Sequence, residues 1–104
     1  MPENKVRELI HETGIPTFPR PKGIPQNYVV SISETGAGMR YTDPIDTGTS
    51  IRVMPGKPHS PNLSQQKPYV IQQVKGRAFD RNGKFVSPDS PEAHIPIQEF
   101  IYRG

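Results

Sequence analysis

Cysteine is absent from this chain of 104 residues. Its absence excludes a disulfide scaffold and any zinc site with thiolate ligands, and it leaves three histidines as the only nitrogen ligands for a metal. No two of these histidines have the spacing of metal ligands on a helix or a hairpin, so we expect neither a metal nor another cofactor. A chain without cysteine also suits a protein that works in both reducing and oxidising compartments.

Long hydrophobic runs are missing as well. No segment approaches the ~18 consecutive apolar residues of a membrane helix, and no signal-peptide pattern opens the chain, so we expect no contact with a membrane. Only 32% of the residues are apolar, while 13 prolines and 9 glycines indicate many turns and short elements. This length predicts a single domain, residues 1–104, with one modest core that a partner would supplement.

Positive charge is concentrated in one block of the sequence. The net charge is +3, and residues 57–84 contain six lysines and arginines but only one acidic residue, Asp80. Clustering of this kind suits binding to a polyanion, most often a nucleic acid. The ordinary alternative is a solubilising surface with no specific partner.

The first quarter of the chain predicts a helix followed by an extended connector. Within residues 2–13, Val6, Leu9 and Ile10 recur at helical spacing and form one apolar stripe. Gly14 is a natural end for this helix. Residues 15–26 contain four prolines and predict an extended connector that lies across the core, so that residues 1–27 form one unit of helix and connector.

Strand patterns dominate the remainder, residues 28–104. Apolar residues alternate or cluster in four segments that we expect to be strands, residues 28–33, 39–42, 50–54 and 69–74. Asn82-Gly83 predicts a hairpin between residues 78–79 and 85–86, and we expect a last strand at residues 100–102. The fold class that follows is α+β, with the N-terminal helix packed on a twisted antiparallel sheet of four to six strands.

Two loops, residues 55–68 and 87–94, are rich in proline, and each contains one histidine, His59 and His94. Proline stiffens such loops and removes amide donors, so a histidine held there favours chemistry over packing. Cleavage of RNA without a metal needs a base, an acid and a cation, because the 2′-hydroxyl is itself the nucleophile. His59 and His94 are the candidate base and acid, in either order, and Lys57 and Arg52 are the cations for the scissile phosphate.

Six further residues are candidates for substrate binding. Ser60, Asn62 and Gln66 would donate hydrogen bonds to phosphate or base, and Tyr41 or Tyr69 would stack on a base. The complete candidate set for substrate binding is Arg40, Tyr41, Ser60, Asn62, Gln66 and Tyr69.

Each candidate also has an ordinary interpretation. His59 is then a solvated loop residue, His94 a half-buried histidine bonded to a carbonyl, and Arg52 an arginine on the sheet surface. Tyr41 and Tyr69 are, on the same interpretation, residues at the edge of the core. The sequence itself does not show that the two histidine loops meet.

Four segments resemble a known family of toxins. They are residues 38–44 (GMRYTDP), 51–56 (IRVMPG), 65–70 (QQKPYV) and 90–96 (SPEAHIP). In this order, over roughly residues 28–100, they resemble the C-terminal toxin domains of bacterial polymorphic toxins of the contact-dependent inhibition and Rhs type. The resemblance implies an effector that is secreted or delivered as part of a larger protein, acts in the cytoplasm of a competing cell, and is neutralised by an acidic immunity protein.

Many toxin domains of this kind are ribonucleases, and several share the fold of the barnase–EndoU–colicin–RelE-like group. EndoU-like members use two histidines and a lysine, and the resemblance implies that His59, His94 and Lys57 would fill these roles. The resulting hypothesis is a toxic endoribonuclease that cleaves RNA by general acid–base catalysis without a metal. The alternatives are a metal-dependent DNase effector and a non-enzymatic interaction module whose proline-rich loop recognises a partner.

Overall fold

The only α-helix in the described part of the chain lies at its start. The structure, a computed structural model, describes residues 2–104, and α1 spans Glu3–His11. Val6 and Ile10, one turn apart, are buried, and burial of each such side chain stabilises the fold by roughly 1.5–3 kcal/mol. The predicted helix over residues 2–13 is confirmed and is slightly shorter at both ends.

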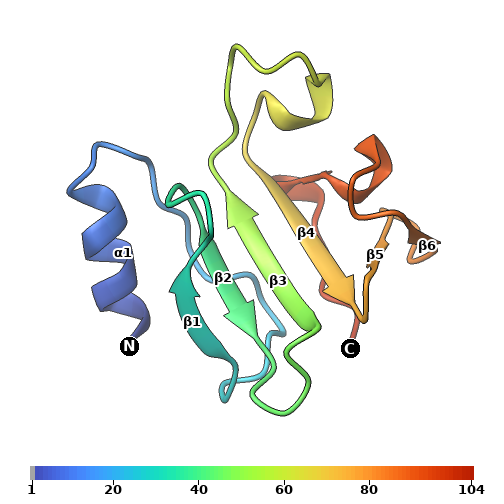
Figure 1. The fold of residues 1–104 in the computed structure, drawn as a ribbon, viewed down its shortest axis with the longest axis horizontal. Helices are drawn as coiled ribbons and strands as arrows, with labels where there is room; N and C mark the ends of the chain where they lie inside the picture. Colours follow the sequence, from blue (N-terminus) through green and yellow to red (C-terminus); the bar gives the residue numbers. More distant parts are fainter. Residues whose placement is uncertain (1) are drawn as a thin grey trace.

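An antiparallel sheet forms the rest of the framework (Figure 1). Within residues 2–104 its seven strands are β1 Val29–Ile32, β2 Met39–Thr42, β3 Thr49–Met54, β4 Tyr69–Val74, β5 Arg77–Phe79, β6 Phe85–Val86 and β7 Ile95–Pro96. Strands β1 to β6 follow one another in sequence order, so each lies beside its chain neighbour. Strand β7 pairs with β4 at Tyr69 and Val70, whereas β5 pairs with β4 further along, at Gln73 and Val74. The α+β class is therefore confirmed, with β7 as an additional short strand.

The expected strand at residues 100–102 is wrong. That segment has no regular structure, although Phe100 and Tyr102 pack against the core. The adjoining Arg103 pairs instead with the side chain of the buried Gln72. The Gln72 amide nitrogen donates to the Arg103 carbonyl at 2.6 Å, and the Arg103 N–H donates to Gln72 Oε1 at 2.9 Å. An amide side chain thus provides the hydrogen bonds that a neighbouring strand would have provided.

One face of the sheet, here called the closed face, carries the main core. Its buried strand residues are Val30, Met39, Tyr41, Ile51, Val53 and Val70. Helix α1, the connector and the C-terminal segment cover this face, and Ile24 of the connector is 4% exposed. Ile15 and Phe18 also pack there, so the prediction that the connector crosses the core is confirmed.

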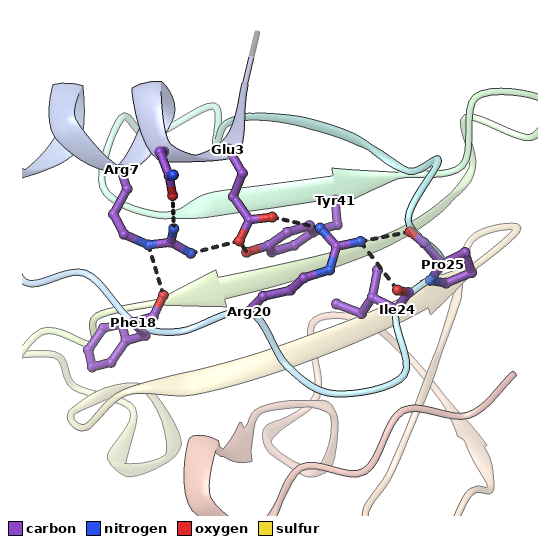
Figure 2. A network of polar contacts seen from close by, with 8 residues as sticks. Glu3, Arg7, Phe18, Arg20, Ile24, Pro25 and Tyr41 are labelled. Carbon is purple, nitrogen blue, oxygen red and sulfur yellow. Dashed lines mark hydrogen bonds and ion pairs between the residues drawn. The ribbon is translucent and has the colours of Figure 1, made fainter.

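A polar network joins α1, the connector and β2 beneath this cover (Figure 2). Glu3 accepts hydrogen bonds from Arg7 at 2.8 Å, from Arg20 at 2.7 Å and from the Tyr41 hydroxyl at 3.2 Å. Arg20 also donates to two connector carbonyls, those of Ile24 and Pro25. Burial on its own raises the pKa of Glu3, but the hydrogen bonds from Arg7 and Arg20 outweigh burial, and the pKa lies below its usual value.

The opposite face, here called the open face, carries the alternate strand residues. Arg40 of β2 lies directly opposite Arg52 of β3, and Arg52 lies opposite Ile71 of β4. Because successive side chains alternate, Arg40 and Arg52 point away from the core that Tyr41 and Ile51 enter. A small apolar cluster of Ile71, Ala78 and Ala93 lies on this face, with Tyr69 and Val86 packed against it.

Candidate functional site

The loop that contains His59 is folded back on itself by its own hydrogen bonds. The Lys57 N–H donates to the Gln65 carbonyl at 2.8 Å, and the Ser60 N–H donates to the Lys57 carbonyl at 2.9 Å. At the base of the loop Gly56 has a φ of +80°, and a Cβ there would lie 2.5 Å from the Lys67 carbonyl carbon. Glycine is therefore required for the two ends of the loop to approach each other.

The folded loop lines a solvent-open hollow of about 700 Å³, here called the loop hollow. It is lined by Gly56, Lys57, Pro58, His59, Ser60, Pro61, Asn62 and Gln65. His59 and Lys57 are exposed, so an imidazole and an ammonium group are open to solvent in the same hollow. Four residues selected from the sequence, namely Lys57, His59, Ser60 and Asn62, are therefore brought together.

His94 lies on the second loop and is only 8% exposed. Its Nδ1 lies 2.8 Å from the Ser90 carbonyl, and its Nε2 lies 3.1 Å from the amide nitrogen of Gln65. A carbonyl accepts only, so Nδ1 carries the proton, and an amide nitrogen donates only, so Nε2 accepts. The two ring nitrogens of His94 are thus both hydrogen-bonded within the protein, and the ring packs edge-on against Tyr69 at 4.9 Å between centroids.

Gln65 connects the two histidine loops. It lines the loop hollow beside His59, and its side chain donates to His94 from 29 residues away along the chain. In Figure 1 the short helical turn of residues 63–65 lies close to the segment of residues 91–93, and the two are in contact. The loops therefore meet, although through Gln65 and not through the two imidazole rings.

The candidate catalytic residues are distributed over three hollows that share no lining residue. His94 lines a second hollow of about 360 Å³, here called the histidine hollow, with Asp80, Arg81, Asn82 and Glu92. Arg52 and Arg40 line a third, of about 550 Å³, here called the arginine hollow. His59, His94 and Arg52, the candidates for base, acid and cation, thus line separate hollows.

The two tyrosines selected for base stacking have different environments. Tyr41 is fully buried on the closed face, so its expected role in stacking is wrong, and Tyr41 belongs to the Glu3 network. Burial and the adjacent Glu3 carboxylate raise the pKa of Tyr41 to about 12. Tyr69 is half-buried on the open face, where burial raises its pKa and the Arg52 charge opposes that rise.

Gln65 is the residue that sequence reasoning missed. Gln66, its neighbour, was selected for substrate binding, but the Gln66 side chain donates to the Ser60 carbonyl at 2.9 Å and so supports the loop. Nothing in the sequence distinguishes two adjacent glutamines in a loop without periodicity. Only the pairing of β7 with β4, which brings residues 90–94 beside residues 63–65, makes Gln65 the connecting residue.

Two further features are absent from residues 2–104. No group of three or more histidine, aspartate and glutamate side chains is arranged to hold a metal ion within residues 2–104. None of the helices in that range is long and apolar enough to cross a membrane. Comparisons with family models, curated proteins and solved structures gave no significant match.

Proposed function

We propose that this chain is a toxic endoribonuclease domain that cleaves RNA without a metal, with its reaction centre in the loop hollow. The observation that supports the proposal is that His59 and Lys57 line the same solvent-open hollow, together with the polar side chains of Ser60 and Asn62. Delivery into a competing cell, and neutralisation by an acidic immunity protein, belong to the same proposal and rest on the family resemblance.

The chemistry requires little from the protein, because RNA provides its own nucleophile. The His59 imidazole accepts the proton of a 2′-hydroxyl, and the 2′-oxygen attacks the adjacent phosphorus. The 5′-oxygen leaves with a proton from solvent water, which gives a 2′,3′-cyclic phosphate and a new 5′-hydroxyl. The Lys57 ammonium group stabilises the additional negative charge on the phosphoryl oxygens during this step.

His94 has a positioning role in this proposal. Its Nε2 is occupied by the Gln65 amide, and its ring is buried, so it does not transfer protons to a bound strand. It fixes Gln65, whose carbonyl accepts the Lys57 N–H at 2.8 Å. Through Gln65, His94 thereby fixes the position of Lys57 in the wall of the loop hollow.

The test is incubation of the full chain with single-stranded RNA in the presence of EDTA. We expect cyclic-phosphate products, and we expect His59→Ala to lower the cleavage rate by ~10²–10⁴. His11→Ala is the matched control, because His11 is exposed on α1 and lies outside all three hollows. RNA that stays intact, or an equal loss of rate in both variants, would disprove the proposal. A parallel reaction with plasmid DNA and Mg²⁺ tests the DNase alternative.

The hydrogen bonding of His94 favours a second candidate function, that of a non-enzymatic binding module. Both of its ring nitrogens are hydrogen-bonded within the protein, as in a histidine that serves structure alone. On this alternative the exposed loop of residues 55–68 binds an acidic partner protein. RNA left intact in the assay above, together with tolerance of high expression in bacteria without a partner gene, would favour it.

A further inference from the structure

The arginine hollow contains two arginines of the open face with little compensating charge. Arg40 and Arg52 occupy directly opposite positions on β2 and β3. Like charges at opposite positions of an antiparallel pair repel each other and destabilise the sheet. The Arg40–Arg52 pair is therefore not explained by a contribution to stability.

Little within residues 2–104 compensates these two guanidinium groups. Arg52 takes part in none of the ion pairs formed among those residues. Arg40 has one ion-pair partner, Glu34, at 3.8 Å, and the Glu34 side chain is 93% exposed. An ion pair this long and this exposed contributes almost nothing to stability.

Arg40 also carries an unsatisfied donor. Its Nε is buried and has no hydrogen-bond partner. Buried donors are nearly always satisfied, so the protein itself compensates the Arg40 side chain incompletely. The acceptor that matches two guanidinium forks is an oxyanion with several lone pairs.

The shape of the hollow fits a group of that kind. Its volume is about 550 Å³, and its lining is mostly polar. The floor is provided by Arg40, Arg52 and Gln73, and residues 87–89 form the opposite wall. Gln73 lies on β4, diagonally across from Arg52, so its amide faces the same space.

We propose that the arginine hollow is a phosphate-binding site, in which Arg40 and Arg52 hold one phosphate group and Gln73 donates a further hydrogen bond. The site is separate from the loop hollow and does not depend on RNA cleavage there. The phosphate belongs either to a free mononucleotide or to the backbone of an RNA strand. The exposed carboxylates at the rim, Glu34 and Asp89, limit how strongly a bare ion binds.

The experiment is a titration of the ¹⁵N-labelled full chain, followed by NMR. The three ligands are inorganic phosphate, adenosine monophosphate and a short single-stranded RNA with hydroxyl groups at both ends. We expect amide shifts in β2, β3 and residues 87–89, and a loss of affinity of at least ~10-fold in Arg52→Gln. Shifts with the mononucleotide but not with the RNA identify a free nucleotide as ligand. Shifts with both identify the backbone.

Two further variants make the result decisive. Arg77→Gln removes the same charge from an exposed arginine on β5, whose guanidinium lies 4.5 Å from the Phe85 ring centroid, and should leave affinity unchanged. Glu34→Gln removes a repelling rim charge at an exposed position and should tighten binding by ~2–5-fold. The proposal is overturned if no ligand shifts these amides, if Arg77→Gln weakens binding as much as Arg52→Gln, or if Glu34→Gln weakens it. None of these outcomes depends on whether the protein cleaves RNA.

Discussion

On the closed face, Glu3 lies between Arg7 and Arg20 and accepts a hydrogen bond from each, and the Tyr41 hydroxyl is a third donor. On the open face, Arg40 and Arg52 lie opposite each other, and the carboxylates that line the same hollow, Glu34 and Asp89, are exposed at its rim. Both regions contain two arginines close together, but only one of them contains the carboxylate that neutralises the pair. Charge on the closed face therefore serves the fold, whereas charge on the open face is available to a ligand.

The first prediction concerns apolar burial on the two faces. Ile51 is fully buried on the closed face, and Val29 at the edge of the sheet is 51% exposed. Ile51→Ala should lower the free energy of unfolding by ~2–5 kcal/mol, because it leaves a cavity in the main core. Val29→Ala should change it by less than ~0.5 kcal/mol. Urea denaturation measures both, and equal effects would show that the faces do not differ in packing.

The second prediction concerns the two carboxylates. Glu3→Gln should lower the free energy of unfolding by ~1–3 kcal/mol at pH 7, because Arg7 and Arg20 lose a charged acceptor. Glu34→Gln should change it by less than ~0.5 kcal/mol.

The pH dependence of stability also distinguishes Glu3 from Glu34. The pKa of Glu3 is lowered in the folded protein, so its stabilisation is present above the unfolded pKa, near 4.5, and is lost as the pH falls through the folded value. The loss of stability below about pH 5 should thus be smaller in Glu3→Gln than in the parent protein and unchanged in Glu34→Gln. Thermal melting from pH 3 to 7 measures this, and identical pH profiles for all three proteins would contradict the role given to Glu3.

Part of this architecture follows from sequence and part does not. The alternation of Tyr41 with Arg40, and of Ile51 with Arg52, predicts two faces of opposite character. The same alternation excludes Arg40 and Tyr41 as joint ligands of one substrate, although both were selected. Which face the connector covers depends on Phe18 and Ile24 docking on strands far along the chain, and local patterns do not encode that choice.

The candidate site shows the same division between local and distant contacts. Lys57 and His59 are two residues apart in a stiff loop, so their shared hollow was predictable from spacing. The contact of His94 with Gln65 spans 29 residues and depends on the β4–β7 pairing. It was therefore not predictable from local spacing.

The third prediction tests the hydrogen bond between Gln65 and His94. Gln65→Ala should lower kcat for RNA cleavage by about 10-fold with little change in KM, because the wall that carries Lys57 loses its anchor to His94. Gln98→Ala, at an exposed position, is the control. Unchanged kcat in Gln65→Ala, with cleavage otherwise intact, would remove His94 and Gln65 from the mechanism.

The last stability prediction is a small effect of the opposite sign. Arg52→Gln should raise the free energy of unfolding by ~0.2–1 kcal/mol, because it removes the repulsion between directly opposite arginines. Thermal melting at low ionic strength measures the gain, and the gain should shrink as salt is added. A clear loss of stability would mean that the pair supports the fold and would weaken the contrast between the two faces.

The double hydrogen bond between Gln72 and Arg103 has a consequence for opening motions. Both polar atoms of a buried amide on the central strand β4 are satisfied by the main chain near the C-terminus. Whenever the tail detaches, that amide loses both partners, and water must enter beside Val70 to replace them. Detachment of the tail is thereby coupled to loosening of the sheet centre. Amide protons of β4 and of residues 102–103 should consequently exchange with solvent at similar rates, as one cooperative unit.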